Sequence, residues 1–393
     1  MKEIVIVSGA RTAVGRANRG TLVNTRPDDM AAVVTTEVLK RAPAVNPAEV
    51  DDVIMGCAFP EHSQSFNIGR VAALLAGLPN TVPGQTVNRL CASGLQAIAI
   101  GSQQIMTGMC DIVIAGGTES MSQVPMMGYH VSLNLRMVQE YPEAYIGMGM
   151  TAENVAEKYN VSREDQDAFG LRSNQRALAA IEAGRFKEEI VPLEVKTVQV
   201  TEQGERVESD KIFDVDEGPR RTTPEKMAQL KPAFKNGGTV TAGNSSQMSD
   251  GAAAVLLMTP EKAQEKGLTP FARFVGLAAA GVPPEIMGVG PMYAIPRVMR
   301  VTGFKISDMD LIELNEAFAS QAVACIRHLG LDEDITNVNG GAVAMGHPLG
   351  CTGAKLTVQL IHEMKRRKSR YGLVSMCIGG GQGAAGIFEN LCR

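Results

Sequence analysis

Two stretches of this 393-residue chain carry the same order of short motifs at a nearly constant separation. The segment starting at Asp52 is similar to the one starting at Asp310, Cys91 corresponds to Cys351, and the run around Val113 corresponds to the run around Val374. The offsets are 258, 260 and 261 residues. Self-similarity of this kind indicates a duplicated supersecondary unit, so the sequence predicts two similar halves that face each other.

Short apolar runs alternate with stretches of helical spacing, which predicts an α/β fold with largely parallel sheets. Strands are expected at residues 3–8, 52–56, 112–116, 252–258, 271–277, 310–314 and 372–377. Helices are expected at residues 28–41, 68–76, 92–107, 317–329 and 353–366. The glycine run after Cys377 predicts a hairpin at the end of the chain.

The middle of the chain differs from the rest in composition. Residues 120–249 are polar and lack the repeat, so we interpret them as an inserted domain. The predicted first half of the core is then residues 1–119 plus 250–269, and the second half is residues 270–393.

Charge and cysteine content exclude several classes of protein. The net charge of −4 argues against a general nucleic-acid or anionic membrane surface, and no apolar run reaches the ~18–20 residues of a membrane span. Seven cysteines without a C-x-x-C pair are typical of reduced thiols, so a cytoplasmic location is expected. The arginines of the first thirty residues faintly resemble a transit peptide, but a buried strand and a basic loop explain them better.

Cys91 is expected at the turn between a short strand and the helix 92–107. The free N–H groups and positive end of a helix favour a thiolate, so Cys91 is a candidate nucleophile. The alternative is an inert buried thiol, which is the commonest state of a cytosolic cysteine.

His347 lies in a glycine-rich run from Gly340 to Gly353 and is followed by Pro348. Proline fixes its own φ, so the imidazole is expected on a rigid turn, where a neutral ring near a thiol can act as its base. A structural loop histidine is the alternative. A phosphate cradle is also conceivable, but the Walker pattern is missing.

Two more segments follow predicted strands. Cys377 precedes glycines whose N–H groups can stabilise an oxyanion, although a plain hairpin turn has the same composition. Asn315 and Glu316 can either cap the next helix or reach into a cleft. Because ligands bind at the carboxyl ends of strands in open α/β sheets, we expect two thiols, one imidazole and one amide to converge between the halves.

Together these segments resemble the four signature blocks of the thiolase family: CASG at Cys91, NEAF at Asn315, GHPLGCTG around His347 and CIGGGQG at Cys377. The resemblance runs from end to end and includes IVSGARTAVGR near the N-terminus and TAGNSSQMSDGAAAV. It implies an α/β core of two βαβαβαββ halves in five layers, α/β/α/β/α, with an inserted loop domain that holds coenzyme A.

The resemblance also implies a reaction. Coenzyme A cleaves 3-ketoacyl-CoA to acetyl-CoA and a shortened acyl-CoA, as in fatty acid β-oxidation, and the reverse is a Claisen condensation. Cys91 would carry the acyl group as a thioester. His347 would take its proton and, with a water held by Asn315, stabilise the thioester or enolate oxygen. Cys377 would be the second acid/base, and the N–H groups of Cys91 and Gly379 would form a second oxyanion hole.

In the inserted domain, the resemblance places Ser246 against the pantetheine arm of coenzyme A and Arg220 or Arg221 at its adenine end. Four further side chains are implied beside this arm: Met148, Phe234, Ala242 and Phe318. Coenzyme A is a substrate, and neither a tightly bound cofactor nor a metal ion is expected. The family implies a homo-oligomer, either a dimer or a tetramer.

Gly147 bears on the substrate. Many acetoacetyl-CoA thiolases of the biosynthetic type have a histidine at this place, so glycine favours the degradative branch that acts on longer 3-ketoacyl-CoAs. A short-chain acetoacetyl-CoA thiolase is the alternative.

A β-ketoacyl synthase would need two histidines, and Cys377 argues against it. A non-catalytic acyl-CoA- or lipid-binding relative would form no acyl adduct, whereas all the reactive positions are present here.

Overall fold

Each half of the chain follows the order βαβαβαββ in the computed structural model, which describes residues 2–200 and 206–392. The first half contains β1 (Val5–Arg11), α1 (Pro27–Lys40), β3 (Asp52–Gly56), α2 (Ile68–Leu75), β4 (Gly84–Val87), α3 (Ser93–Met106), β5 (Ile112–Ser120) and β8 (Ser249–Met258). The second contains β9 (Ala272–Gly281), α9 (Gly290–Thr302), β10 (Leu311–Leu314), α10 (Ala319–Leu329), α12 (Leu349–Arg367), β11 (Tyr371–Ile378) and β12 (Gln382–Asn390). Its third strand is reduced to one parallel bridge, between Ile312 and Thr336. The predicted strands, helices and terminal hairpin are confirmed, although β5 and β9 run further than expected. The expectation of largely parallel sheets is wrong: among the described strands only β3–β4, β3–β5 and β10–β11 pair in parallel, and the other strand pairs are antiparallel.

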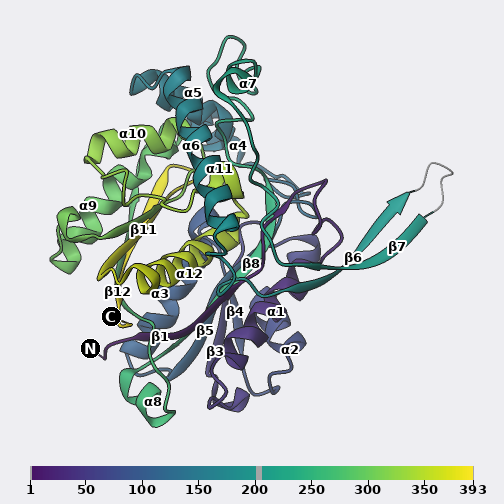
Figure 1. Cartoon of the computed structure of the whole chain (residues 1–393), viewed down its shortest axis with the longest axis vertical. Coiled ribbons are helices and arrows are strands. Elements are labelled where there is room, and N and C mark those ends of the chain that lie inside the picture. Colours follow the sequence, from purple (N-terminus) through teal and green to yellow (C-terminus); the bar gives the residue numbers. More distant parts are fainter. Residues whose placement is uncertain (1, 201–205, 393) are drawn as a thin grey trace.

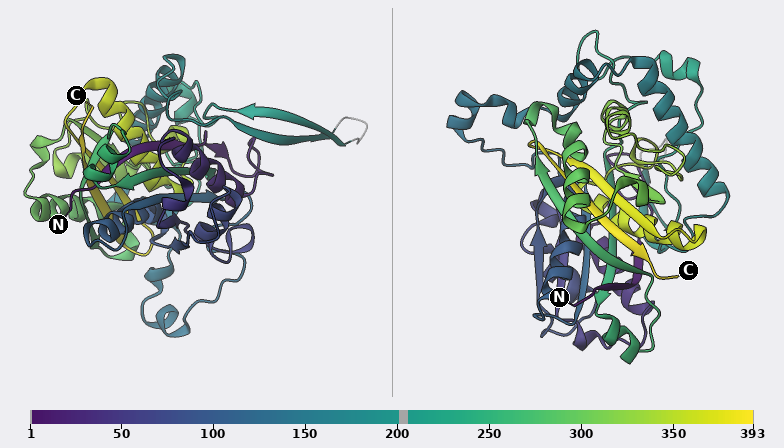
Figure 2. Two further views of the ribbon diagram at one scale, coloured as in Figure 1. Left: turned by 90° about the horizontal axis from the view of Figure 1, so that it is seen from below. Right: turned by 90° about the vertical axis from the view of Figure 1, so that its left-hand side faces the viewer.

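Five layers build the core, as the resemblance implied. Helices α1 and α2 cover the outer face of the first half's strands, while α9 and α10 lie on the outer side of the second half. Between the two sets of strands lie α3 and α12, which contact both of them (Figures 1 and 2). Separate clusters of buried apolar side chains fill the spaces on either side of each set of strands. The apolar residues that the sequence pattern assigns to strands and helices therefore do face the core.

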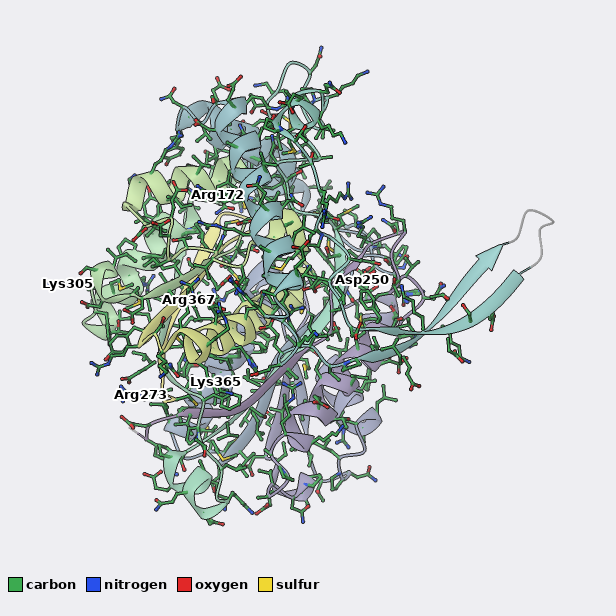
Figure 3. All side chains as sticks on the ribbon, viewed as in Figure 1. Arg172, Asp250, Arg273, Lys305, Lys365 and Arg367 are labelled. Atoms are coloured by element: carbon green, nitrogen blue, oxygen red, sulfur yellow. The ribbon has the colours of Figure 1, made fainter. Side chains whose placement is uncertain are left out.

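The two sets of strands join edge to edge. Among the described residues they form one ten-stranded sheet with the order β10-β11-β12-β9-β1-β8-β5-β3-β4, and β2 (Gly15–Arg16) pairs with β8. The link between the halves is a short antiparallel pairing of β1 with β9, in which Val5 lies opposite Arg273. The Arg273 side chain, labelled in Figure 3, forms ion pairs with Glu3 and Glu389 at this junction.

Backbone registers confirm the duplication and correct its alignment. The Asp51 carboxylate accepts hydrogen bonds from the N–H groups of Asp111 (2.6 Å) and Ile112 (2.9 Å). The Asp310 carboxylate does the same at the start of β11, with the N–H groups of residues 370 (2.7 Å) and 371 (3.0 Å). Asp310 therefore corresponds to Asp51, 259 residues earlier, and the predicted match with Asp52 is wrong by one residue.

The central helices approach closely through one glycine from each half. A Cβ atom on Gly94 would lie 2.7 Å from the Ala354 nitrogen, and one on Gly353 would lie 2.3 Å from the Leu95 nitrogen. Real side-chain atoms do not come so near to backbone, so the contact between α3 and α12 requires glycine at both places. Cys351, which the sequence repeat matches with Cys91, is buried in the first turn of α12. Because Gly94 and Gly353 are paired with an offset of 259 residues, the structural counterpart of Cys351 is Ala92, so this predicted match is also wrong by one residue.

The stretch between β5 and β8 contains α4 (Leu135–Glu140), α5 (Met148–Lys158), α6 (Arg163–Glu182), β6 (Leu193–Val200), β7 (Arg206–Phe213) and α7 (Pro224–Ala228). Strands β6 and β7 form a hairpin that extends away from the core (Figures 1 and 2). The sequence pattern did not predict these elements, and the three-part domain division stays a prediction. None of the helices that the structure describes combines the length and apolar character needed to cross a membrane.

Candidate active site

Cys91 lies in a strained turn between β4 and α3. The preceding residue, Leu90, has a φ of +43°, which is uncommon for a bulky side chain and re-aims the chain abruptly. The Ser93 hydroxyl holds this turn, since it donates to the Leu90 carbonyl (2.6 Å) and accepts from the Arg89 N–H (2.9 Å). Cys91 is thereby fixed at the start of α3 with 9% of its surface exposed.

Two backbone N–H groups point to the Cys91 sulfur, those of Gly379 and of Cys91 itself. Burial nevertheless raises the pKa of this thiol to about 11, with a smaller contribution from the Glu119 carboxylate. The backbone N–H groups do favour the thiolate, as expected, but burial outweighs them, so the thiol is protonated at rest. The nucleophile needs a base.

Cys377 is the penultimate residue of strand β11, on the side of the site that faces the Cys91 turn. Burial raises the pKa of the Cys377 thiol well above its ordinary value, and the charge of a Cys91 thiolate raises it further. A Cβ atom on Gly379 would lie 3.3 Å from the Leu90 Cδ1, so the glycine turn after Cys377 packs against the turn that holds Cys91. Met148 and Phe318 lie in the apolar cluster around Cys377.

His347 is buried, and its hydrogen bonds define its tautomer. Its Nδ1 lies 2.6 Å from the Thr352 hydroxyl, and that hydroxyl donates to the Pro348 carbonyl (2.9 Å). The hydroxyl therefore accepts from Nδ1–H, so the lone pair lies on Nε2. Burial, followed by the charge of Lys355, lowers the pKa of His347 to about 3 and keeps the ring neutral.

Asn315 faces this lone pair. Its Nδ2 lies 3.4 Å from the His347 Nε2, and its backbone N–H donates to the Ser375 carbonyl (2.8 Å). Its Oδ1 accepts no hydrogen bond from the residues that the structure describes. Glu316 neither caps α10 nor enters the cleft: α10 begins after Phe318 without a side-chain cap, and the Glu316 carboxylate points toward α6.

Side chains predicted for the arm of coenzyme A lie on the Cys377 side of the site. The Phe234 and Phe318 rings meet edge to face with centroids 6.1 Å apart. The Met148 sulfur would lie 3.5 Å from a Cβ atom on Gly379. The N–H of Ser246 donates to the Ala317 carbonyl (3.0 Å), so this half-buried serine lies next to the NEAF turn.

The other predicted contacts lie at the surface. Ala242 is exposed. Arg220 is exposed as well, and its neighbours Arg16 and Arg19 contribute, after burial, to a lowered pKa of its guanidinium. Arg221 pairs instead with Glu182 at 2.8 Å. The structure thus groups Arg220 with two further cations that sequence reasoning did not single out.

Sequence reasoning also missed Thr352 and Lys355. The hydroxyl of Thr352 had a recognisable signal, since it lies in the first helical turn after the histidine. Lys355 had none, because a lysine on a helix is normally solvated. Here it is 1% exposed, and burial lowers its pKa despite nearby carboxylates such as Asp216.

Comparisons with known proteins agree with this arrangement. The family "Thiolase, N-terminal domain" matches residues 4–261, and "Thiolase, C-terminal domain" matches residues 268–390. A 3-ketoacyl-CoA thiolase of Bacillus subtilis is 57% identical over the full length of both chains. An acetyl-CoA acetyltransferase of Syntrophomonas wolfei is 44% identical, over 99% of this chain and 100% of that protein.

A solved structure leads to the same family. The crystal structure of the Bacillus anthracis acetyl-CoA acetyltransferase superposes with a TM-score of 0.90 and 44% identity, over 100% of this chain and 99% of the other. Sequence families, relatives and fold agree along the whole length, and the four signature segments meet at one site. This chain belongs to the thiolase family.

Proposed function

We propose that this enzyme is a 3-ketoacyl-CoA thiolase with Cys91 as its acyl carrier. One observation supports this most: the Gly379 turn that follows Cys377 packs against the Leu90–Cys91 turn, with 3.3 Å between a Cβ on Gly379 and the Leu90 Cδ1, so that both thiols lie beside the same N–H groups. The 57% identical relative of Bacillus subtilis is named for the same reaction.

In the first half-reaction, the Cys91 proton passes to the His347 Nε2, and the sulfur attacks the 3-keto carbon of the substrate. The bond between C2 and C3 then breaks, which leaves the acyl group on Cys91 and expels the acetyl-CoA enolate. The Cys377 thiol protonates its C2 carbon, so acetyl-CoA leaves. Donors on the enolate oxygen, such as Asn315 together with His347, are worth ~3 kcal/mol each at sites of this kind.

In the second half-reaction, the Cys377 thiolate takes the proton of the incoming coenzyme A. The coenzyme sulfur attacks the thioester carbon, and the N–H groups of Cys91 and Gly379 stabilise the tetrahedral oxyanion. Collapse of this intermediate releases the shortened acyl-CoA, and the imidazolium of His347 returns its proton to Cys91.

For coenzyme A itself, we propose a path along the inserted domain. Ser246 and the apolar side chains of Met148, Phe234, Ala242 and Phe318 are assigned to the pantetheine arm. The exposed cations Arg19 and Arg220, with the half-buried Arg16 beside them, suit the phosphate groups at the other end, since guanidinium pairs well with phosphate. The coenzyme acts here as a substrate and not as a resident cofactor.

Two variants test the assignment of the thiols. Cys91→Ala should abolish both acyl labelling by acyl-CoA and thiolysis. Cys377→Ala should still become acylated at Cys91 yet lose C–C bond cleavage by a factor of at least ~100. Mass spectrometry of the acylated peptide and the loss of enolate absorbance measure the two outcomes. Appreciable thiolysis by Cys91→Ala would exclude it as the nucleophile.

Gly147 supports a preference for longer chains and a role in β-oxidation, because no atoms lie within 4 Å of a Cβ placed there. A panel of 3-ketoacyl-CoAs with four to sixteen carbons tests this. A kcat/KM that falls steeply above four carbons would favour an acetoacetyl-CoA thiolase instead, the activity suggested by the names of the 44% identical relatives.

A homo-oligomer in the cytoplasm completes the proposal. Large apolar side chains are exposed throughout one segment, at Met126, Met127, Tyr129, Val131, Leu133, Leu135, Met137, Val138 and Tyr141. Such a concentration marks an association surface. Sedimentation of the enzyme should show a dimer or a tetramer. Leu135→Lys should lower the mass of this assembly. Met109→Lys, at an exposed methionine outside the segment, should leave the mass of the assembly unchanged. A monomer would contradict this part of the proposal.

A further inference from the structure

The Glu316 carboxylate is buried beside the candidate site and fully engaged. It accepts hydrogen bonds from the Ser173 hydroxyl (2.6 Å), the Asn337 Nδ2 (2.8 Å) and the Val343 N–H (3.2 Å). These donors come from three separate parts of the chain: α6, the loop after α10, and α11 (Ala342–Met345). Burial raises the pKa of Glu316 while the three donors lower it, which fits a carboxylate held in place by its neighbours.

Two of these connections lead directly to the reactive groups. Asn315 precedes Glu316 in the chain, so the carboxylate anchors the residue next to the catalytic amide. On the other side, α11 ends at Met345, and Gly346 alone separates it from His347. Both partners of the 3.4 Å contact between Asn315 and His347 are therefore tied to the same carboxylate.

The fit around Glu316 is tight. A Cβ atom on Gly341 would lie 2.2 Å from the Glu316 Cδ, so only glycine leaves room for the carboxylate. The Gly341 N–H donates to the Ser173 oxygen (3.1 Å), and this oxygen in turn donates to Glu316. Ser173 thus bridges the start of α11 and the Glu316 carboxylate. Its place on α6 is marked in Figure 3 by the label of the preceding residue, Arg172.

We propose that Glu316 is a positioning residue that sets the geometry of the Asn315–His347 pair, and that Ser173 makes this geometry depend on the docking of α6. Helix α6 belongs to the stretch assigned to coenzyme A binding, so the contact couples the coenzyme-binding part of the molecule to the pair that stabilises the enolate. The inference rests on the proposed thiolase reaction. Small displacements of such pairs are costly, since a misplacement of ~1 Å can reduce a rate about 100-fold.

Ser173→Ala is the sharpest test, because it removes one hydrogen bond and leaves a good helix former. We expect kcat for thiolysis to fall about tenfold while KM for coenzyme A stays within about twofold. The matched control is Ser102→Ala, at a buried serine on α3 whose hydroxyl has no partner among the described residues. It should leave both constants unchanged, and thermal unfolding of both variants shows whether stability accounts for the difference.

Glu316→Gln provides a second variant with nearly the same shape. A carboxamide presents an NH2 group to one of three donors, so one contact becomes repulsive and kcat should fall further than in Ser173→Ala, by about 100-fold. A kcat unchanged in both variants, or a rise in KM alone, would overturn the positioning role. An inactive wild-type enzyme would instead reject the proposed function, and the inference with it.

Discussion

At the scale of single residues, the reactive groups rest in their neutral forms. Burial raises the pKa of the Cys91 thiol to about 11 and lowers that of His347 to about 3. Transfer of the proton from sulfur to imidazole is therefore unfavourable in the free enzyme, and the oxyanion donors must compensate for it once substrate is bound. The nucleophile is consequently protected from reaction with other electrophiles until its substrate arrives.

This raised pKa predicts the pH dependence of alkylation. Only the thiolate reacts, so the rate of Cys91 modification by iodoacetamide should rise about tenfold per pH unit from pH 7 to 10. Mass spectrometry of the Cys91 peptide measures this rate separately from that of the other thiols. A rate that is flat between pH 6 and 8 would show a thiolate–imidazolium pair in the resting enzyme and contradict the prediction.

The candidate site residues could be predicted from the sequence, whereas their protonation states could not. Cys91, Asn315, His347 and Cys377 lie in short blocks of distinctive composition that follow predicted strands. Their pKa values depend on how completely other segments cover them, and that coverage comes from contacts between distant parts of the chain. For the same reason, nothing in the sequence marked Lys355 as a buried charge.

At the scale of elements, the contact between α3 and α12 is the most demanding in the fold. Gly353→Ala would place a methyl group against the Leu95 backbone, and the helices would have to separate. We expect the free energy of unfolding to fall by about 1–3 kcal/mol, as in other overpacked cores. Urea denaturation followed by circular dichroism measures the change.

Gly101→Ala on α3 is the matched control for that substitution. Its new methyl group would meet the ends of the Val113 and Leu257 side chains, which can move, instead of backbone. Alanine also favours a helix by about 1 kcal/mol over glycine, so the control should lose little stability. An equal loss of unfolding free energy in both variants would show that the backbone contact between α3 and α12 does not determine the cost of the substitution.

Elements were predictable where periodicity and burial agree. The strands β1, β3, β5 and β8 are buried throughout, and their apolar runs stand out in the sequence. The hairpin β6–β7 joins the core only at its base, through Leu193, Val195 and Phe213, and charged residues elsewhere in it leave no continuous apolar run. The third strand of the second half escaped prediction because it pairs at one bridge only, through Thr336.

At the scale of the whole molecule, one buried arginine ties the inserted stretch to the core. Arg11 on β1 is fully buried and pairs with Glu189 (2.7 Å) and Asp216 (2.8 Å), which flank the β6–β7 hairpin. Arg11→Met would leave two buried carboxylates without their partner. The free energy of unfolding should fall by about 3–5 kcal/mol, the cost of breaking a buried ion pair.

The half-exposed pair of Arg327 with Asp165 provides the comparison, since solvent screens its charges. Arg327→Met should change the free energy of unfolding by at most about 1 kcal/mol. Urea denaturation of both variants measures the difference. Similar values for the two would mean that Arg11 contributes no more than a surface arginine and that other contacts hold the inserted stretch.

Helices α3 and α12 occupy matching places in the two halves, yet the turn before α3 carries the proposed nucleophile Cys91, whereas Cys351 in the first turn of α12 only fills space. In an ancestor made of two identical subunits, every mutation that improved the reactive turn would also have altered its packing counterpart. Fusion of the copies into one gene removes that conflict. Selection can then tune chemistry in one copy and rigidity in the other, which is how a symmetric scaffold comes to hold an asymmetric centre.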